Sequence, residues 1–254
     1  MKTQEINTNM GSIAVAVDRV ENSIPVVFLH GVFLDRDLWR AYGTDFTHRS
    51  HVYVDMPGHG ESGDVGRAWR LEECVTMLMQ ILDALAIERC VVIGQSWGSM
   101  VALRAANQFP QRFEALGLFN MPHTKTTGMR KAGFWMQKMF MGMPRFYARQ
   151  AAQSLYSEDV LKRHPELVTR MQERMSKRSA RELSRLVDAV ILCPDDARRY
   201  IEKLKVPALA FIGEDDYVGR PPGLDTGMIP GRHISPHESE EKTRAAISRV
   251  LALA

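Results

Sequence analysis

Short runs of aliphatic and β-branched residues alternate with helical periodicity over the first 120 residues, and this alternation limits the possible folds more than any other feature. The runs predict strands at residues 13–17, 25–29, 51–55, 89–93 and 115–119. Two of them contain the segments VVFL and CVVI, which are apolar throughout, as strands buried on both faces are. Apolar residues at helical spacing predict a helix after the third run: Leu71, Cys74, Val75, Leu78, Leu82 and Leu85. Alternating strands and helices favour an α/β fold with a mostly parallel central sheet covered by helices.

The strand pattern disappears between residues 121 and 203, where the composition is typical of helices. A buried strand returns at residues 207–213, and a closing helix is predicted at 240–253. We therefore expect one α/β core, formed by residues 1–120 and 204–254, which an all-helical cap at residues 121–203 interrupts. A chain of 254 residues is long enough to bury a large core of this kind.

The pentapeptide GQSWG at residues 94–98 stands between a predicted strand and a helical stretch at residues 99–108. A G-x-S-x-G motif in this setting is typical of a sharp strand-to-helix turn that presents its serine as a nucleophile. The flanking glycines allow the strand and the helix to approach closely, and the serine backbone is strained. Ser96 is therefore the candidate nucleophile.

The chain resembles the α/β-hydrolase family over nearly its whole length. The resemblance rests on five segments in the family's order: His30-Gly31 after a strand, DMPGHGES at residues 55–62, GQSWG at 94–98, GEDD at 213–216 and GRH at 231–233. It implies the α/β-hydrolase fold and a catalytic serine, acid and histidine in that order along the chain. A serine nucleophile excludes the haloalkane dehalogenases and epoxide hydrolases of this family, because their alkyl-enzyme ester needs an aspartate.

By this resemblance, His233 is the base that accepts the proton of Ser96, with His237 as the local competitor. A carboxylate must orient the imidazole and stabilise its cation. Asp216 matches the family's acid, and Asp215 is the alternative. Some relatives carry the acid at the end of the preceding strand, where this chain has only Asn120.

Acyl transfer also requires two backbone N–H groups that stabilise the oxyanion of the tetrahedral intermediate. Trp97, directly after the nucleophile, is expected to supply one. Val32 is expected to supply the other, with Phe33 as the alternative. His30 and His59 are expected to form hydrogen bonds with loop backbone rather than to take part in catalysis.

The spacing between Asp216 and His233 is short for the family, which usually places a helix and a final strand there. The sequence GRPPG at residues 219–223 also interrupts any helix. We expect a compact loop with a last strand of only a few residues near Met228.

The cap is expected to provide the substrate contacts, because residues 132–147 combine methionines with aromatic side chains. Flexible thioethers and aromatic rings line pockets for apolar ligands. The candidate substrate-binding residues are Phe33, His123, Trp135, Met139 and Met143. Residues 132–147 fit two other interpretations, packing within the cap itself and a lid at a lipid interface. For His123 the alternative is packing at the hinge of the cap.

The expected function is hydrolysis of a carboxylic ester or a lactone through an acyl-enzyme on Ser96, without a metal or an organic cofactor. An apolar acyl chain or a ring-containing substrate would bind under the cap. Two alternatives remain open. One is a carbon–carbon bond hydrolase of the same fold, and the other is a ligand receptor that retains the three catalytic residues.

Charge and targeting signals add little to this hypothesis. Residues 121–203 contain 17 Lys and Arg against 9 Asp and Glu, which we interpret mainly as solvated helix faces. No apolar segment suits membrane insertion, and the N-terminus lacks the apolar segment of a signal peptide. Three scattered cysteines predict neither a disulfide framework nor a metal cluster. We expect a cytoplasmic protein whose partner is a small-molecule substrate, not nucleic acid, and the oligomeric state stays open.

Overall fold

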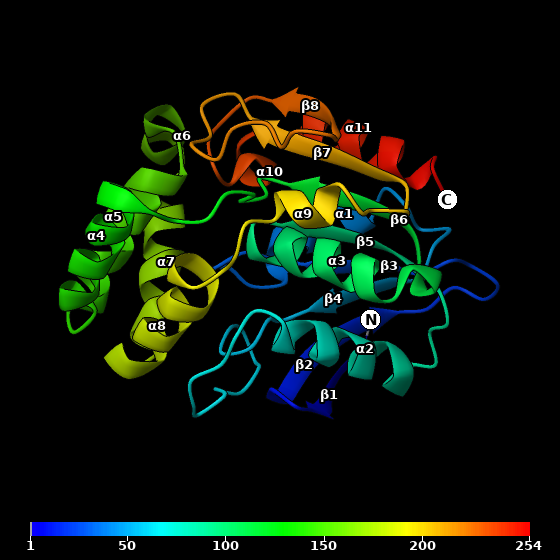
Figure 1. Cartoon of the computed structure of the whole chain (residues 1–254), viewed down its shortest axis with the longest axis horizontal. Helices are drawn as coiled ribbons and strands as arrows, with labels where there is room; N and C mark the ends of the chain where they lie inside the picture. Colours follow the sequence, from blue (N-terminus) through cyan, green and yellow to red (C-terminus); the bar gives the residue numbers. More distant parts are fainter. Residues whose placement is uncertain (1) are drawn as a thin grey trace.

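The computed structural model describes residues 2–254, and a single mixed sheet organises the fold (Figure 1). Its strands are β1 (Lys2–Thr8), β2 (Gly11–Asp18), β3 (Val26–Leu29), β4 (His51–Val54), β5 (Cys90–Gln95), β6 (Phe113–Phe119), β7 (Ala208–Gly213) and β8 (Asp225–Ile229). They lie in the order β1-β2-β4-β3-β5-β6-β7-β8. Only the β1–β2 and β2–β4 pairs are antiparallel, and the strands from β4 to β8 are parallel.

Helices cover both faces of this sheet (Figure 1). The core helices are α1 (Asp37–Gly43), α2 (Glu73–Ala84), α3 (Trp97–Gln108), the 3-10 turn η1 (Pro110–Arg112), α9 (Arg198–Ile201), α10 (Ser235–Glu238) and α11 (Glu240–Leu251). In Figure 1, α2, α3 and α9 lie on one face, and α1 and α11 on the other. β3 and β5 are buried at every residue, which explains their uninterrupted apolar sequences.

The structure confirms the predicted α/β architecture and each strand expected from an apolar run. It adds β1, which the sequence did not reveal. β1 is an edge strand that pairs only with β2, and Ile6 is its one buried residue. A strand with so little buried surface lacks the apolar alternation from which strands are recognised. α1 was also missed, because a helix of only two turns is too short to show a helical period.

The segment between β6 and β7 contains helices and no strand within the described chain. These helices are α4 (Gly128–Gln137), the 3-10 turn η2 (Lys138–Phe140), α5 (Pro144–Leu155), α6 (Glu158–Arg163), α7 (Glu166–Ser176), α8 (Ala180–Val187) and the π-helical turn η3 (Asp188–Leu192). In Figure 1, α4 to α8 stand together at one end of the sheet. α9 follows them and contacts α3 of the core, so we propose that the cap proper ends before it.

Ion pairs fix the cap to loops of the core. Arg174 of α7 forms a bidentate pair with Asp35, with N–O distances of 2.5 and 2.9 Å. Arg185 of α8 contacts Asp64 at 2.6 Å. The segment that returns from the cap is held in turn by Arg104, a fully buried side chain of α3 that pairs with Asp195.

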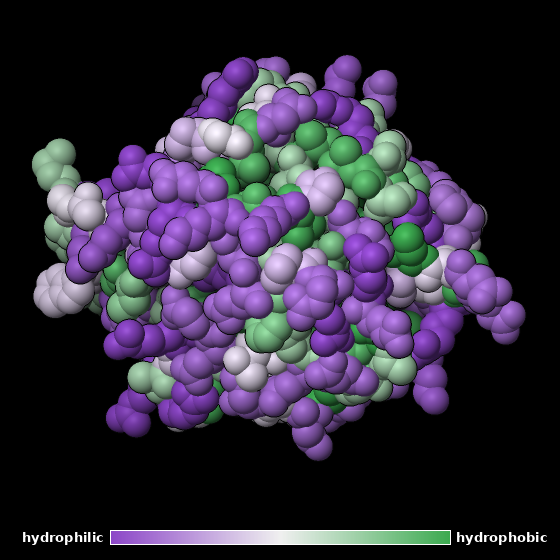
Figure 2. Space-filling model, turned by 45° about the vertical axis from the view of Figure 1, so that its right-hand side comes forward, coloured by the Kyte–Doolittle hydropathy of each residue, from purple (hydrophilic) through white to green (hydrophobic). Residues whose placement is uncertain are grey.

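Hydrophilic side chains cover most of the face shown in Figure 2, with smaller hydrophobic groups between them. Among residues 2–254, no helix has both the length and the apolar character that crossing a bilayer requires.

β5 and α3 approach each other closely at the turn that carries Ser96. A Cβ atom on Gly94 would lie 2.4 Å from backbone atoms of Gly98 and Ser99. A Cβ atom on Gly98 would lie 2.3 Å from the carbonyl oxygen of Leu29. Both neighbours are backbone atoms, which cannot move aside as a flexible side chain can. These two positions therefore require glycine.

Replacing Gly98 with alanine should lower the free energy of unfolding by about 3 kcal/mol or more, because the new methyl group overlaps the backbone of β3. Gly133, in α4, is the matched control. Its Cβ would meet nothing within 4 Å, and alanine there should stabilise by roughly 0.5–1 kcal/mol through helix propensity. Urea denaturation of both variants measures the difference. Equal stabilities would contradict the steric argument.

Candidate active site

Ser96 occupies the turn between β5 and α3 in a strained conformation. Its φ angle is +49°, in the left-handed region that residues with a side chain rarely adopt. The backbone N–H of Ser96 donates to the carbonyl of Phe119 at 2.8 Å, which ties the turn to β6. Its hydroxyl Oγ lies 2.8 Å from Nε2 of His233, across 137 residues of sequence. This is hydrogen-bonding distance between the hydroxyl and the imidazole, as required of the candidate nucleophile and base.

His233 and Asp216 come from the loops that follow β8 and β7. Nδ1 of His233 lies 2.9 Å from Oδ1 of Asp216, and both side chains are almost completely buried. Burial alone would raise the pKa of Asp216, but hydrogen bonds from His233 and Asn120 outweigh it and lower the pKa. The carboxylate is therefore ionised near neutral pH and keeps the Nδ1 proton on its side of the ring. Nε2 is left free to accept the proton of Ser96.

Asn120 organises the far side of this carboxylate. Its Nδ2 donates to Oδ2 of Asp216 at 2.8 Å and to the carbonyl of Arg232 at 3.1 Å. Its Oδ1 accepts from the hydroxyl of Ser235 at 2.8 Å. Asn120 therefore joins the acid to the loop that bears the histidine. The sequence marked this position only as one without an acid, although its place at the end of a strand beside the nucleophile was a usable signal.

The structure does not bring the two alternative residues to Ser96. Asp215 is exposed, and its backbone N–H donates to Gly231 at 3.1 Å. His237 lies on α10, where Nδ1 is 2.7 Å from the hydroxyl of Tyr156 and the two rings are stacked. As expected, the segment between Asp216 and His233 is compact and contains only the short strand β8.

The N–H groups of Val32 and Trp97, which are expected to stabilise the oxyanion, are free to donate in the described part of the chain, whereas the N–H of the alternative, Phe33, is not. The N–H groups of Val32 and Trp97 have no acceptor within residues 2–254, and Trp97 is the first residue of α3, where backbone N–H groups lack an intrahelical partner. The N–H of Phe33 donates instead to Nε2 of His59 at 3.1 Å. The alternative of Phe33 as an oxyanion donor is therefore wrong, because its N–H already has an acceptor.

His30 and His59 form hydrogen bonds with loop backbone, as the sequence predicted. Nε2 of His30 accepts from the N–H of Met56 at 2.9 Å, and its Nδ1 donates to Gly31 at 2.7 Å. Nδ1 of His59 donates to Pro57 at 3.0 Å. Burial lowers the pKa of His59 to about 3 and also lowers that of His30. Both imidazoles are therefore neutral, as their acceptor role requires.

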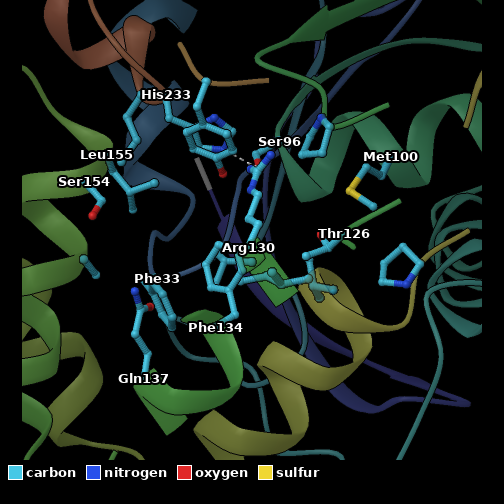
Figure 3. A pocket seen from close by; sticks show the side chains of 18 of the residues that line it. Phe33, Ser96, Met100, Thr126, Arg130, Phe134, Gln137, Ser154, Leu155 and His233 are labelled. Carbon is cyan, nitrogen blue, oxygen red and sulfur yellow. Dashed lines mark hydrogen bonds between the residues drawn. The ribbon is translucent and has the colours of Figure 1, made fainter. Parts of the chain in front are cut away.

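A cavity of about 270 Å³ opens between Ser96 and the cap (Figure 3). Ser96 and His233 lie in its wall. Most of the other lining side chains are apolar, and they include Phe33, Met100, Phe134, Tyr147, Leu155 and Val190. Of the Lys and Arg residues in the described chain, only Arg130 contributes to this wall. The cavity could therefore hold an apolar group against the nucleophile.

Only Phe33 of the expected substrate-binding residues lines this cavity. Trp135, Met139 and Met143 are 66%, 73% and 52% exposed and lie outside it. The prediction was wrong for these three. α4 turns Arg130, Phe134 and Gln137 inward instead of Trp135. That spacing of four and three residues marks one helix face. Met139 on η2 and Met143 before α5 are exposed to solvent.

His123 is also outside the lining. It is buried, and its carbonyl accepts from the N–H of Ala197 at 2.9 Å, so it joins the two segments that lead into and out of the cap. His123 therefore stabilises the connection between the cap and the core and does not line the pocket.

A stack of side chains that the sequence did not reveal covers the imidazole of His233. The ring of Tyr217 lies on it with a centroid distance of 4.8 Å. The guanidinium of Arg130 lies over the Tyr217 ring, 4.2 Å from its centroid. Arg130 comes from α4, so this stack links the cap directly to the base.

Solved structures with the same fold cover almost the whole chain. An enol-lactonase from Burkholderia xenovorans LB400 superposes with a TM-score of 0.88 over 98% of this chain and 100% of its own, at 18% identity. A thermophilic esterase from Thermogutta terrifontis gives a TM-score of 0.84 over 99% and 98%, at 22% identity. At these identities the similarity establishes the fold alone.

Sequence relatives match a shorter segment. A 2-succinyl-6-hydroxy-2,4-cyclohexadiene-1-carboxylate synthase from Klebsiella pneumoniae is 37% identical over 98 residues, which are 38% of this chain and 38% of the relative. The epoxide hydrolase 4 of Mus musculus is 31% identical over 101 residues, 39% of this chain and 28% of the relative. The family model matches much more of the chain, from residue 24 to residue 221, and its description is alpha/beta hydrolase fold. The chain therefore belongs to the α/β-hydrolase fold family.

Proposed function

We propose that the protein is a serine hydrolase that cleaves a carboxylic ester or a lactone through an acyl-enzyme on Ser96. One observation carries this proposal: the continuous hydrogen-bonded series from Ser96 Oγ through the imidazole of His233 to the carboxylate of Asp216, at the wall of an apolar cavity. Nucleophile, base and orienting acid in this geometry are the components that acyl transfer requires.

In the proposed mechanism, Ser96 Oγ attacks the carbonyl carbon while its proton moves to Nε2 of His233. The N–H groups of Val32 and Trp97 stabilise the oxyanion of the tetrahedral intermediate. Its collapse releases the alkoxide oxygen, which takes the proton from His233. In a lactone this oxygen stays attached to the acyl group. Water then attacks the acyl-enzyme and His233 accepts its proton. Collapse of the second tetrahedral intermediate releases the carboxylic acid, and His233 returns the proton to Ser96 Oγ.

The apolar lining supports an apolar acyl chain or a ring-containing group as the part of the substrate under the cap. An enol-lactonase and an esterase among the solved structures of this fold agree with such a substrate.

We place the protein in the cytoplasm. Its cysteines Cys74, Cys90 and Cys193 are free, which fits a reducing compartment.

A second candidate is chemistry at a carbon–carbon bond, favoured by the similarity to the cyclohexadiene carboxylate synthase. Turnover of vinylogous diketones without turnover of any ester or lactone would support it. Covalent labelling of Ser96 by a fluorophosphonate, combined with multiple turnover of a p-nitrophenyl ester, would support the hydrolase. Labelling without any turnover would indicate a receptor that retains the three residues.

Replacing Ser96 or His233 with alanine should each lower kcat for a p-nitrophenyl ester by roughly 10⁴–10⁶-fold, because nucleophile and base act as one unit. The double variant should lose little more than either single variant. His237→Ala is the control and should keep most activity, because His237 contacts Tyr156 and not Ser96. A larger loss in His237→Ala than in His233→Ala would move the base to His237.

The two neighbouring aspartates give a second discriminating pair. Asp216→Asn should lower kcat by about 10³–10⁴-fold, because the amide no longer holds the Nδ1 proton or stabilises the imidazolium. Asp215→Asn should retain most activity, since its side chain is exposed. Steady-state kinetics of both variants checks this. Comparable losses would mean that the acid has been assigned to the wrong residue.

The lining of the cavity predicts which substitutions change the preferred acyl length. Ala151 of α5 lines the cavity, so leucine there should move the optimum of an ester series toward shorter chains. Each methylene that no longer fits should cost up to about fourfold in kcat/KM. Met139→Leu, which changes an exposed side chain outside the cavity, should leave the profile unchanged. Identical profiles for all three proteins would place the acyl group elsewhere.

A further inference from the structure

The first part of the cap exposes an unusual amount of apolar surface. Of the ten large hydrophobic side chains exposed among residues 2–254, seven lie here and form what we call the cap face: Met129, Trp135, Met136, Met139, Phe140, Met143 and Phe146. The rings of Phe140 and Phe146 are 5.5 Å apart, which joins η2 to α5 within this face. Exposed apolar side chains gathered in one segment of the chain are typical of an interaction site.

α4 lacks the packing that normally stabilises a helix. Neither α4 nor η2 contains a buried residue. A helix of ten residues is marginal in water, and most helices in proteins are stabilised by burying an apolar face. The inward residues Arg130, Phe134 and Gln137 line the catalytic cavity, and α4 lies at the outer edge of the cap (Figure 1). Nothing within residues 2–254 buries the opposite, apolar side of α4.

The chain segment that carries the cap face contains charges of a single sign. Residues 121–157 contain six Lys and Arg and no Asp or Glu. Lys138 pairs with Asp188 of η3 at 2.6 Å, and the other five have no ion pair among the described residues. A second copy of the chain is a poor occupant, because a two-fold symmetric contact would bring these cations together. The face instead complements an apolar surface that carries negative charge.

We propose that the cap face docks on the surface of an anionic lipid bilayer. Trp and Phe beside Lys and Arg are the residues of helices that lie in a lipid interface, with the apolar side chains at the acyl boundary and the cations among the headgroups. Because α4 also lines the cavity, this orientation places the catalytic cavity next to the lipid. The proposal does not depend on the reaction that Ser96 catalyses.

Trp135 provides a direct readout. The other three tryptophans, Trp39, Trp69 and Trp97, are buried, so a change in emission on adding lipid reports Trp135. With the full-length chain, vesicles of phosphatidylcholine and phosphatidylglycerol should shift the emission to shorter wavelength and sediment the protein. Vesicles of phosphatidylcholine alone should bind at least about tenfold more weakly, and high salt should weaken the binding to anionic vesicles.

Two sets of variants test the surface itself. Trp135→Ser with Phe140→Ser should lower vesicle affinity about tenfold or more, and Lys125→Glu with Lys131→Glu should remove the preference for anionic lipid. Met228→Ser with Leu253→Ser removes exposed apolar side chains elsewhere and should bind as the parent does. Hydrolysis of a soluble ester should not change in any of them.

Three outcomes would overturn the proposal. One is the absence of binding to anionic vesicles. Another is equal binding by the cap-face and control variants. The third is a dimer, or a complex with an acidic protein, that occupies the cap face and excludes lipid.

Discussion

The backbone contact beneath Ser96 is the constraint on which the site depends. β5 can turn directly into α3 only because Gly94 and Gly98 leave no Cβ atoms between the two backbones and β3. The turn forces Ser96 to a φ of +49°, which costs of order 1–3 kcal/mol. Hydrogen bonds offset this cost, since Ser99 Oγ contacts the carbonyls of Gly94 at 2.7 Å and Phe119 at 3.0 Å. The packing of three parallel strands thus sets the position of one hydroxyl group.

A second strained residue stands beside the first. Asn120, at the end of β6, has a φ of +50° and directs its amide at Asp216. The carboxyl ends of neighbouring parallel strands meet at one edge of the sheet, so both left-handed residues and the loops after β7 and β8 converge there. The histidine loop lies directly on Gly213, whose Cβ would be 2.1 Å from the carbonyl of Arg232. Close backbone contacts therefore fix the positions of the Ser96 turn and of the loop that bears His233.

The sequence predicted those parts that depend on local pattern. β3 and β5 followed from uninterrupted apolar runs, and Ser96 from a motif between a strand and a helix. His233 and Asp216 needed the family's order, because nothing local joins residues so far apart in the chain. Placement within the cap could not be predicted. Whether Trp135 or Phe134 faces the cavity depends on how α4 is rotated against the core. The sequence does not decide this, because α4 carries large apolar residues on both sides of the helix. Tyr217 was missed because its stacking on His233 is purely tertiary.

The neutral imidazoles of His30 and His59, beside the loop that carries Val32, also couple unfolding to proton uptake. In the unfolded chain a histidine binds a proton below about pH 6.5, whereas His59 in the folded chain does so only near pH 3, and the pKa of His30 is lowered in the same direction. Between these values the unfolded state holds more protons, so the free energy of unfolding decreases as the pH falls. Protonation of His59 would also remove the acceptor of the Phe33 N–H. Acid therefore weakens the fold at the loop that carries Val32, by removing this hydrogen bond.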